Sequence, residues 1–310
     1  MLLGALLLVV GIALVIWGAE RFTDGAIGAA ARFALSPFIV GTVVSGLEPE
    51  NLVTGVAAAV GGLPQVALGT VIGAAIFMLT AGLGLALLLV PMEVRVPRAG
   101  AVAMGLSLAA FAVTLWNDGT VSRGEGAGLV AVAVGLMAWL CRRSPVFLAA
   151  TPEDPRRLPS RARSLGLLVV GIGGMVLGAE LVVRGAAVLI SSLQLSETFL
   201  GMTVVALGES LEETARMVTP ARRGHPELAW GNVVGTVVVL LGLNLGVIAL
   251  IRPLGADPLV LRLHAPYLLG CTVLVAAGLL WARRLGRGMG LLLVGLYVLY
   301  LALNLPHAWR

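Results

Sequence analysis

The chain contains two copies of one sequence pattern, and this repeat limits the folds that are open to it. The segment "WGAERFTDGAIGAAARFALSPFIVGTVV" at 17–44 aligns with "LGAELVVRGAAVLISSLQLSETFLGMTVV" at 177–205. The shared positions are Gly18 and Gly178, Ala19 and Ala179, Glu20 and Glu180, Gly25 and Gly185, Ala26 and Ala186, Ser36 and Ser196, and Gly41 and Gly201. Further on, 68–87 matches 230–249, and Pro91 matches Pro253. The sequence therefore predicts two structurally equivalent halves.

Long apolar runs separate these motifs. Hydrophobic residues make up 59% of the chain and charged residues 12%, against about 25% charged residues in soluble domains. A hydrocarbon core of about 30 Å needs roughly 20 apolar residues for one helical pass. The apolar runs lie near 1–18, 26–61, 66–90, 99–116, 126–141, 165–179, 186–219, 228–251, 265–282 and 289–305. The second and seventh runs are too long for one straight helix and carry acids and glycine, so we expect broken helices there.

The parity of the spans fixes how the two copies enter the membrane. Five spans separate them, an odd number, so the copies must cross in opposite directions. We predict an all-α polytopic membrane protein of ten transmembrane helices, arranged as two inverted five-helix repeats. The N-terminal repeat covers 1–141 and the C-terminal repeat 165–310, with the Pro- and Arg-rich segment 142–164 as the linker.

The basic residues indicate the orientation. They lie at span ends, and they are more numerous in the linker and the loops on its side than in the opposite loops. By the positive-inside rule the linker is cytoplasmic and both termini face outward, in a prokaryotic cell membrane. Because arginines at span ends have this ordinary explanation, we expect a lipid bilayer as partner and no nucleic acid. The sequence carries no signal for an oligomeric state.

Five carboxylates fall inside the two broken spans: Glu48, Glu50, Glu209, Glu212 and Glu213. An ionisable side chain at the centre of a membrane helix costs roughly 2.5–3.5 kcal/mol to insert, so such a cluster needs a functional reason. Ca²⁺ binds six to eight oxygen ligands, often carboxylates and carbonyls. Pro49 disfavours helix at the residue before it and suits the first turn of a new helix, which would free carbonyls near the acids.

Four motifs occur together: "GAE" leading into "GA", an expected broken helix with acids, "GNVVG" at 231–235 and "NDGTVSRGEG" at 117–126. This set resembles the motifs of the calcium/cation antiporter superfamily, which includes the sodium/calcium exchangers. The resemblance covers both halves and implies ten helices, with ions held at mid-membrane between the two broken helices.

The ion-binding motifs depart from the pattern G-T-S-x-P-E of that family. In "GESLEE" at 208–213, Ser210 and Glu213 fall on the serine and the ion-binding glutamate, while Glu209 and Glu212 replace threonine and proline. The first repeat keeps Pro49-Glu50 but loses the threonine and serine. In the following helix of the second repeat, Asn232 and Thr236 keep the family's residues.

We therefore expect a secondary active antiporter, not an enzyme, without a cofactor, that exchanges Ca²⁺ or a related cation for H⁺ or Na⁺ by alternating access. Glu50 and Glu213 are the expected primary ligands of the metal ion. Secondary ligands or supports would be Glu209, Ser210, Glu48, Glu212, Asn51, Asn232 and Thr236. The first repeat lacks the neutral oxygens that build Na⁺ sites in this family, which favours H⁺.

Arg216 opens a second interpretation. If 209–216 is helical, Arg216 shares a face with Glu209, Glu212 and Glu213, and its guanidinium stays charged. It could neutralise the acids, which would make the chain a degenerate, non-transporting structural or regulatory relative. Alternatively, its side chain extends toward the cytoplasmic end near Arg222. Elsewhere, we expect His264 at the surface and an interhelical hydrogen bond from Asn244.

Overall fold

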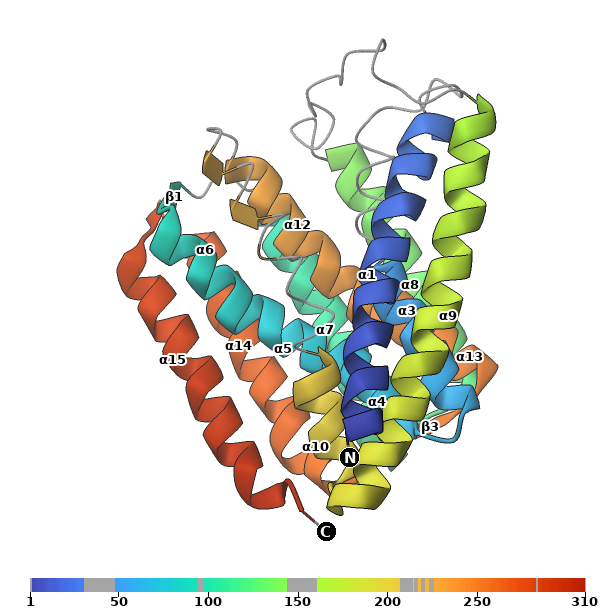
Figure 1. Ribbon diagram of the computed structural model, residues 1–310. Coiled ribbons are helices and arrows are strands. Elements are labelled where there is room, and N and C mark those ends of the chain that lie inside the picture. Colours follow the sequence, from blue (N-terminus) through green and yellow to red (C-terminus); the bar gives the residue numbers. More distant parts are fainter. Residues whose placement is uncertain are drawn as a thin grey trace.

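The computed structural model describes residues 2–30, 48–93, 98–143, 161–206, 214, 217–218, 221–222, 226–282 and 284–309. It is a bundle of helices (Figure 1). Within these residues, eight helices are long and apolar enough to cross a membrane. They are Leu2–Phe22, Pro64–Leu89, Arg98–Asp118, Arg123–Leu140, Ala162–Leu193, Ala229–Ile251, Val260–Trp281 and Arg287–His307. The two broken spans expected at 26–61 and 186–219 lie partly outside the described residues.

In the N-terminal half, the elements run in the order of the expected spans. They are α1 (Leu2–Ala30), α3 (Pro49–Val60), α4 (Pro64–Leu68), η2 (Gly69–Gly73), α5 (Ala74–Phe77), η3 (Met78–Gly82), α6 (Leu83–Leu89), β1 (Met92–Glu93), α7 (Arg98–Asp118), β2 (Thr120–Val121) and α8 (Arg123–Arg143). The segments η2 and η3 are π-helical turns inside one continuous helix from α4 to α6. Such turns add a residue to the helical repeat and shift the side chains that follow.

The C-terminal half has a similar order. Its elements are α9 (Arg161–Leu193), α10 (Glu197–Phe199), η6 (Leu200–Val205), α12 (Pro226–Val238), η7 (Val239–Asn244), α13 (Leu245–Ile251), β3 (Leu254–Gly255), η8 (Val260–His264), α14 (Ala265–Trp281), β4 (Arg284–Leu285), α15 (Arg287–Asn304) and η9 (Leu305–His307). Here η6, η7 and η8 are π-helical, and η9 is a short 3₁₀ turn.

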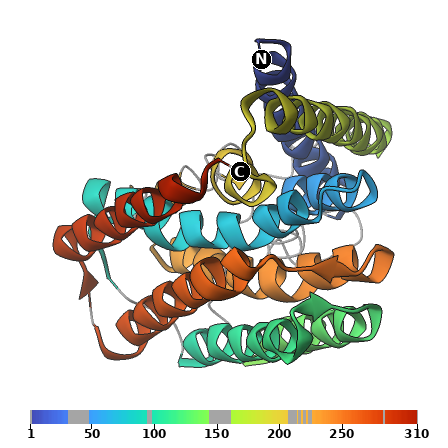
Figure 2. The same ribbon diagram turned by 90° about the horizontal axis from the view of Figure 1, so that it is seen from below.

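Two spans occupy the centre of the bundle. In the most apolar 18-residue stretch of each span, 89% of the residues are buried in Pro64–Leu89 and 72% in Ala229–Ile251. In the other six spans the buried share of residues is 28–44%. Figure 2 shows α1 and α9 paired at one edge and α7 and α8 at the opposite edge, with the central helices between them. The central spans can be apolar all round because protein surrounds them, whereas the outer spans leave one side exposed.

The first and sixth spans extend further than predicted. Helix α1 continues to Ala30 rather than ending near Gly18, and α9 continues to Leu193 rather than ending at Ala179. The charged residues that marked span ends in the sequence are accommodated inside the helices. Glu180 accepts a hydrogen bond from Arg184 Nε at 2.7 Å, one turn along the same exposed face. The chain leaves α9 only after Leu193, where Gln194 adopts a left-handed conformation with φ 53°.

A ladder of glycines brings α1 and α9 into close antiparallel contact. Gly4, Gly11, Gly18 and Gly25 recur every seven residues in α1, and they face Gly185, Gly178, Gly171 and Ser164 of α9. A Cβ added at Gly11 would lie 2.8 Å from the Gly178 carbonyl oxygen, and one at Gly178 would lie 2.7 Å from the Gly11 carbonyl oxygen. Small residues permit this approach, which drives helix association in a membrane where hydrophobic burial does not.

Two short antiparallel ladders join the halves at the span ends. In one, β1 pairs with β4, with Met92 opposite Leu285 and Glu93 opposite Arg284. In the other, β2 pairs with β3, with Val121 opposite Leu254 and Thr120 opposite Gly255. Each ladder therefore links one loop of the N-terminal half to one loop of the C-terminal half.

Candidate cation site

A helix starts inside the second apolar run, at the proline where the sequence predicted a new helical segment. Helix α3 begins at Pro49, and Glu48 precedes it in a left-handed conformation with φ 42° and ψ 59°. Residues other than glycine pay about 1–2 kcal/mol for this conformation. The surrounding contacts must therefore hold Glu48 in place.

Both halves of the chain supply these contacts. Asn244, the last residue of η7, donates from Nδ2 to the Glu48 carbonyl oxygen at 3.2 Å, which confirms the predicted interhelical hydrogen bond. Thr236 of α12 donates from Oγ1 to Glu48 Oε1 at 2.9 Å. Asn51 Nδ2 lies 3.5 Å from Glu48 Oε2, at the limit of a hydrogen bond. These four side chains are fully buried.

One face of α3 carries a run of buried oxygen-bearing side chains. Glu50, Asn51 and Thr54 follow Glu48, and all three are fully buried. Thr54 lies one helical turn after Glu50, so their side chains share a face. Among the described residues Thr54 Oγ1 has no hydrogen-bond partner, and neither has the Asn244 side-chain oxygen. Buried polar atoms normally have partners, so these oxygens are candidates to meet an ion or water.

The predicted residues of the second repeat divide into two groups. Thr236 meets Glu48, and Asn232 precedes it by one turn on the same helix with its Nδ2 buried and without a partner in the described part of the chain. Glu209, Ser210, Glu212, Glu213 and Arg216 lie outside the described residues. The described residue after Glu213 is Thr214, whose Oγ1 would lie 3.3 Å from a Cβ added at Gly82, the last residue of η3.

The described residues thus gather two carboxylates with neutral oxygens, and they do so without a cluster of three or more His, Cys, Asp or Glu side chains. Carboxylate, amide and hydroxyl oxygens suit hard cations rather than soft ones. Thr54 was missed as a candidate ligand because it stands in an apolar run, where the usual role is packing, whereas Asn244 was expected to form an interhelical hydrogen bond rather than to bind an ion. The spacing of Thr54 from Glu50, one turn, was the available signal.

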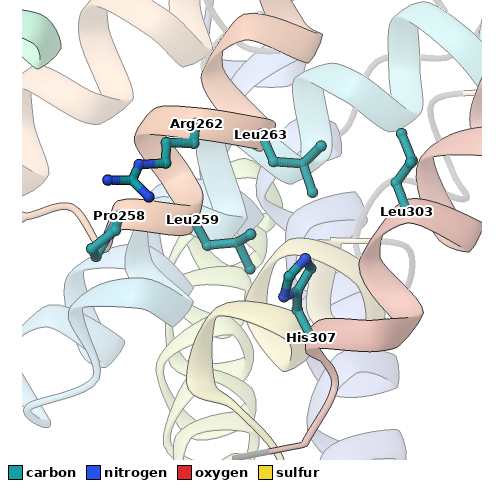
Figure 3. Close-up of a pocket in the computed structure, with 6 residues that line it drawn as sticks. All are labelled: Pro258, Leu259, Arg262, Leu263, Leu303 and His307. Carbon is teal, nitrogen blue, oxygen red and sulfur yellow. The ribbon is translucent and has the colours of Figure 1, made fainter.

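A surface groove of about 350 Å³ lies apart from these acids. It is lined by Pro258, Leu259, Arg262, Leu263, Leu303 and His307, at the beginning of η8 and the end of α15 (Figure 3). Since neither Glu48 nor Glu50 lines it, the groove does not form the cation site.

The prediction that His264 lies at the surface is wrong. It is fully buried, and its Nδ1 forms a hydrogen bond with the Tyr300 hydroxyl at 2.9 Å. The Tyr300 hydroxyl also donates to the Met202 carbonyl oxygen of η6 at 3.3 Å. A histidine at the end of an apolar run is typical of an exposed loop. His264 can be buried here because Tyr300 of α15 provides a hydrogen-bond partner.

Comparison with known proteins agrees with this architecture. The family model of the sodium/calcium exchanger proteins matches residues 3–142 and 163–305. The inner membrane protein YrbG of Escherichia coli K12 is 32% identical over 321 residues, covering 98% of this chain and 97% of that protein. A putative antiporter, CaxA of Alkalimonas amylolytica, is 29% identical and covers 82% of both chains.

Solved structures of a relative show the same fold. The sodium-calcium exchanger NCX_Mj, in crystals soaked with Na⁺ and Sr²⁺, superimposes with a TM-score of 0.65 at 26% identity, over 97% of this chain and 98% of that one. The family is one of membrane transporters and not of enzymes. The chain belongs to the sodium/calcium exchanger family of cation antiporters.

Proposed function

We propose that the protein exchanges Ca²⁺ or a related cation for H⁺ or Na⁺ by alternating access to a site between its two halves. The observation that carries this proposal is the pair of fully buried carboxylates, Glu48 and Glu50, at a helix start where Thr236 and Asn244 of the other half donate hydrogen bonds to Glu48. Carboxylate, hydroxyl and amide oxygens are the ligands that a hard cation such as Ca²⁺ prefers.

Glu50 and Glu213 are the proposed primary ligands of the transported metal ion. One carboxylate from each half would balance the double charge of Ca²⁺. Glu48, Glu209, Ser210, Glu212, Asn51, Asn232 and Thr236 are the proposed secondary ligands or supports, and Thr54 and Asn244 join them on the strength of their buried oxygens. Arg216 would modulate the charge of the site.

The ten-helix inverted repeat is part of the proposal, with 1–141 and 165–310 as the repeats and 142–164 as a cytoplasmic linker. The pairing of the short ladders supports it. Under the alignment in which Pro91 matches Pro253, β1 corresponds to β3, with Met92 at the position of Leu254. Strand β1 pairs with β4, which lies between α14 and α15, and β3 pairs with β2, which lies between α7 and α8, so each ladder joins equivalent loops once the alignment is shifted by two residues between β2 and β4.

Helix contacts follow the same exchange. Gly84 of α6 packs against Gly290 of α15, where an added Cβ would lie 2.9 Å from the Gly290 carbonyl oxygen. Gly246 of α13 packs against Gly126 of α8, with a corresponding distance of 2.6 Å. Since Gly84 aligns with Gly246, the two contacts are equivalent under the repeat. Two halves in opposite orientations give this exchange, as alternating access by rocking of repeats requires.

The identity of the cargo is also proposed from relatives. One relative is called a putative antiporter and another, MaX1 of Methanosarcina acetivorans, a sodium/calcium exchanger; the latter is 29% identical over 140 residues. Hard oxygen ligands on this chain agree with a Ca²⁺ cargo. We propose H⁺ first as the counter-ion, because the first repeat has lost Ser, Thr and Asn positions of the family motif that build Na⁺ sites. Na⁺ is the second candidate.

The test is ⁴⁵Ca²⁺ flux into proteoliposomes under an imposed pH or Na⁺ gradient. The wild-type protein should accumulate Ca²⁺ under one of the two gradients, and Glu50→Gln and Glu213→Gln should abolish the uptake. Glu93→Gln is the matched control, because Glu93 is an exposed glutamate outside the site. No uptake by the wild type under either gradient would contradict the function, and uptake unaffected by both site variants would contradict the site.

The proposed orientation, with both termini outside a prokaryotic inner membrane, has its own test. A reporter that is active only in the cytoplasm, fused to the C-terminus, should be inactive. The same reporter inserted in the linker should be active. The reverse result would overturn the orientation without affecting the site.

A further inference from the structure

A half-buried carboxylate ties α10 to α4. Glu197, the first residue of α10, accepts hydrogen bonds at Oε1 from the backbone N–H groups of Gln65 at 2.5 Å and Val66 at 3.4 Å. These N–H groups belong to the first turn of α4, where a helix has unpaired donors and a partial positive charge. A hydrogen bond from such donors to a carboxylate is stronger than one between neutral groups.

The Gln65 side chain closes this contact into a ring. Its Nε2 donates to the Gly255 carbonyl oxygen at 2.8 Å, and its Oε1 accepts from the Asp257 backbone N–H at 3.2 Å. Thr198, next to Glu197, donates from Oγ1 to Asp257 Oδ2 at 2.5 Å. We call Glu197, Gln65, Asp257 and Thr198 the ring. Gln65 and Thr198 are buried, with 6% and 2% of their surfaces exposed.

Backbone packing leaves no space between the two segments that the ring joins. A Cβ added at Gly201 of η6 would lie 2.7 Å from the Gln65 carbonyl oxygen and 2.7 Å from the Val66 Cα. One added at Gly69 would lie 2.4 Å from the Gly201 carbonyl oxygen. Helix α4 and η6 are therefore in backbone contact directly beyond the ring, and no ion passes between them in this conformation.

The ring lies at one end of the molecule, and the sequence at the equivalent positions of the other half cannot form it. Figure 1 shows α10, α4 and β3 at the end where both termini lie. Under the repeat, Glu197 corresponds to Pro37 and Thr198 to Phe38, neither of which has a carboxylate or hydroxyl group. The positions equivalent to Gln65 and Asp257 are Glu227 and Arg95. The two ends are thus chemically different, although the scaffold repeats.

We propose that Glu197 is a positioning residue that locks η6 to α4, and that the ring keeps the cation path shut at the end that carries the termini. The inference rests on the proposed antiport, because alternating access requires each end to open in turn. Opening this end must break or distort the ring. The equivalent residues of the other half cannot form the same hydrogen bonds. The ring therefore biases the cation-free protein toward access from the linker end, and its strength sets the balance between the two states.

Labelling of one cysteine from each side of the membrane tests the lock. In a background with Cys141→Ser and Cys271→Ala, Thr54→Cys places a reporter on the buried face of α3, one turn from Glu50. A membrane-impermeant maleimide is added from the side of the termini in one sample and from the linker side in the other. Glu197→Ala should raise the labelling rate from the side of the termini about ten-fold, the factor expected for losing a hydrogen bond to a charged group.

Two further variants test whether the effect comes from the contact between Glu197 and α4 or from a general destabilisation of the protein. Glu197→Gln keeps an acceptor oxygen for the Gln65 N–H and should label at an intermediate rate. Glu180→Ala removes an exposed glutamate of α9 that pairs only with a surface arginine among the described residues, and should label like the parent. An unchanged rate in Glu197→Ala, or an equal rise from both sides, would overturn the lock. The labelling needs no transport, so failure of the ⁴⁵Ca²⁺ flux is a separate result.

Discussion

The contact between α1 and α9 gives the sharpest test of how the two halves are held together. Gly178→Ala places a Cβ 2.7 Å from the Gly11 carbonyl oxygen and 2.7 Å from the Val15 backbone nitrogen. Ordinary contacts begin near 3.4 Å, so the helices must separate locally by several tenths of an ångström. Both clashing atoms are backbone, so neither can turn away as a side chain would. Overpacking of this kind costs about 1–3 kcal/mol.

The same helix offers a matched control. A Cβ added at Gly173 of α9 meets nothing within 4 Å, so Gly173→Ala gains the better helix propensity of alanine, about 0.5–1 kcal/mol. Because Gly178→Ala gains the same propensity, the two alanine variants should differ by the overpacking cost alone, about 1–3 kcal/mol in unfolding free energy.

Thermal unfolding of the purified protein in one detergent, followed by the loss of the monodisperse peak in size-exclusion chromatography, ranks the variants. The order should be Gly173→Ala at or above the wild type, and Gly178→Ala below it. Equal midpoints for the two variants would show that the glycine ladder does not set the distance between these helices, and would refute the reasoning.

Three further substitutions test hydrogen bonds made by polar side chains. Thr236→Val removes the donor to Glu48 with little change of shape and should lower the unfolding free energy by about 1.5–3 kcal/mol, while Thr236→Ser keeps the hydroxyl and should stay close to the wild type in the same melting assay. Arg252→Met removes the guanidinium that donates to the last carbonyls of α3 at 2.8 and 3.1 Å; the loss of about 0.3–2 kcal/mol should appear as faster amide exchange at that helix end, and unchanged exchange would argue against the cap. Tyr300→Phe leaves His264 Nδ1 buried without its partner and should cost about 1–3 kcal/mol, so an unaltered melting temperature would show that water replaces the hydroxyl.

The spans of the central helices were predictable because length and apolar composition decide them. The start of α3 at Pro49 was also predictable, since proline disfavours the helical conformation at the residue before it and is itself accepted in the first turn of a helix. The ends of α1 and α9 were not predictable. Glu180 and Arg184 mark a boundary when read singly, but they pair across one helical turn and stay inside the helix. The positions of charged residues in the sequence do not show which of them will form ion pairs.

The candidate site was partly predictable from residue type. Carboxylates inside apolar spans drew attention to Glu48 and Glu50, and the structure buries both, with Thr236 hydrogen-bonded to Glu48. The role of Asn244 depends on the π-helical turn η7, which ends at that residue. The sequence carried no sign of this turn. Threonine and asparagine in apolar runs carry no signal of their own, so their contribution emerges only from helix packing.

The residues that hold Glu48 have no counterparts of the same chemistry in the first half. Asn244 corresponds to Gly82 in the first half, and Thr236 corresponds to Ala74. Asn244 and Thr236 donate hydrogen bonds to the strained residue before α3, whereas glycine and alanine carry no side-chain donor. Thr214 lies next to Gly82, and its hydroxyl is buried without a described partner. The shared glycines and prolines thus preserve the scaffold in both halves, while the polar side chains distinguish them. The proposed cation site therefore draws unequally on the two halves.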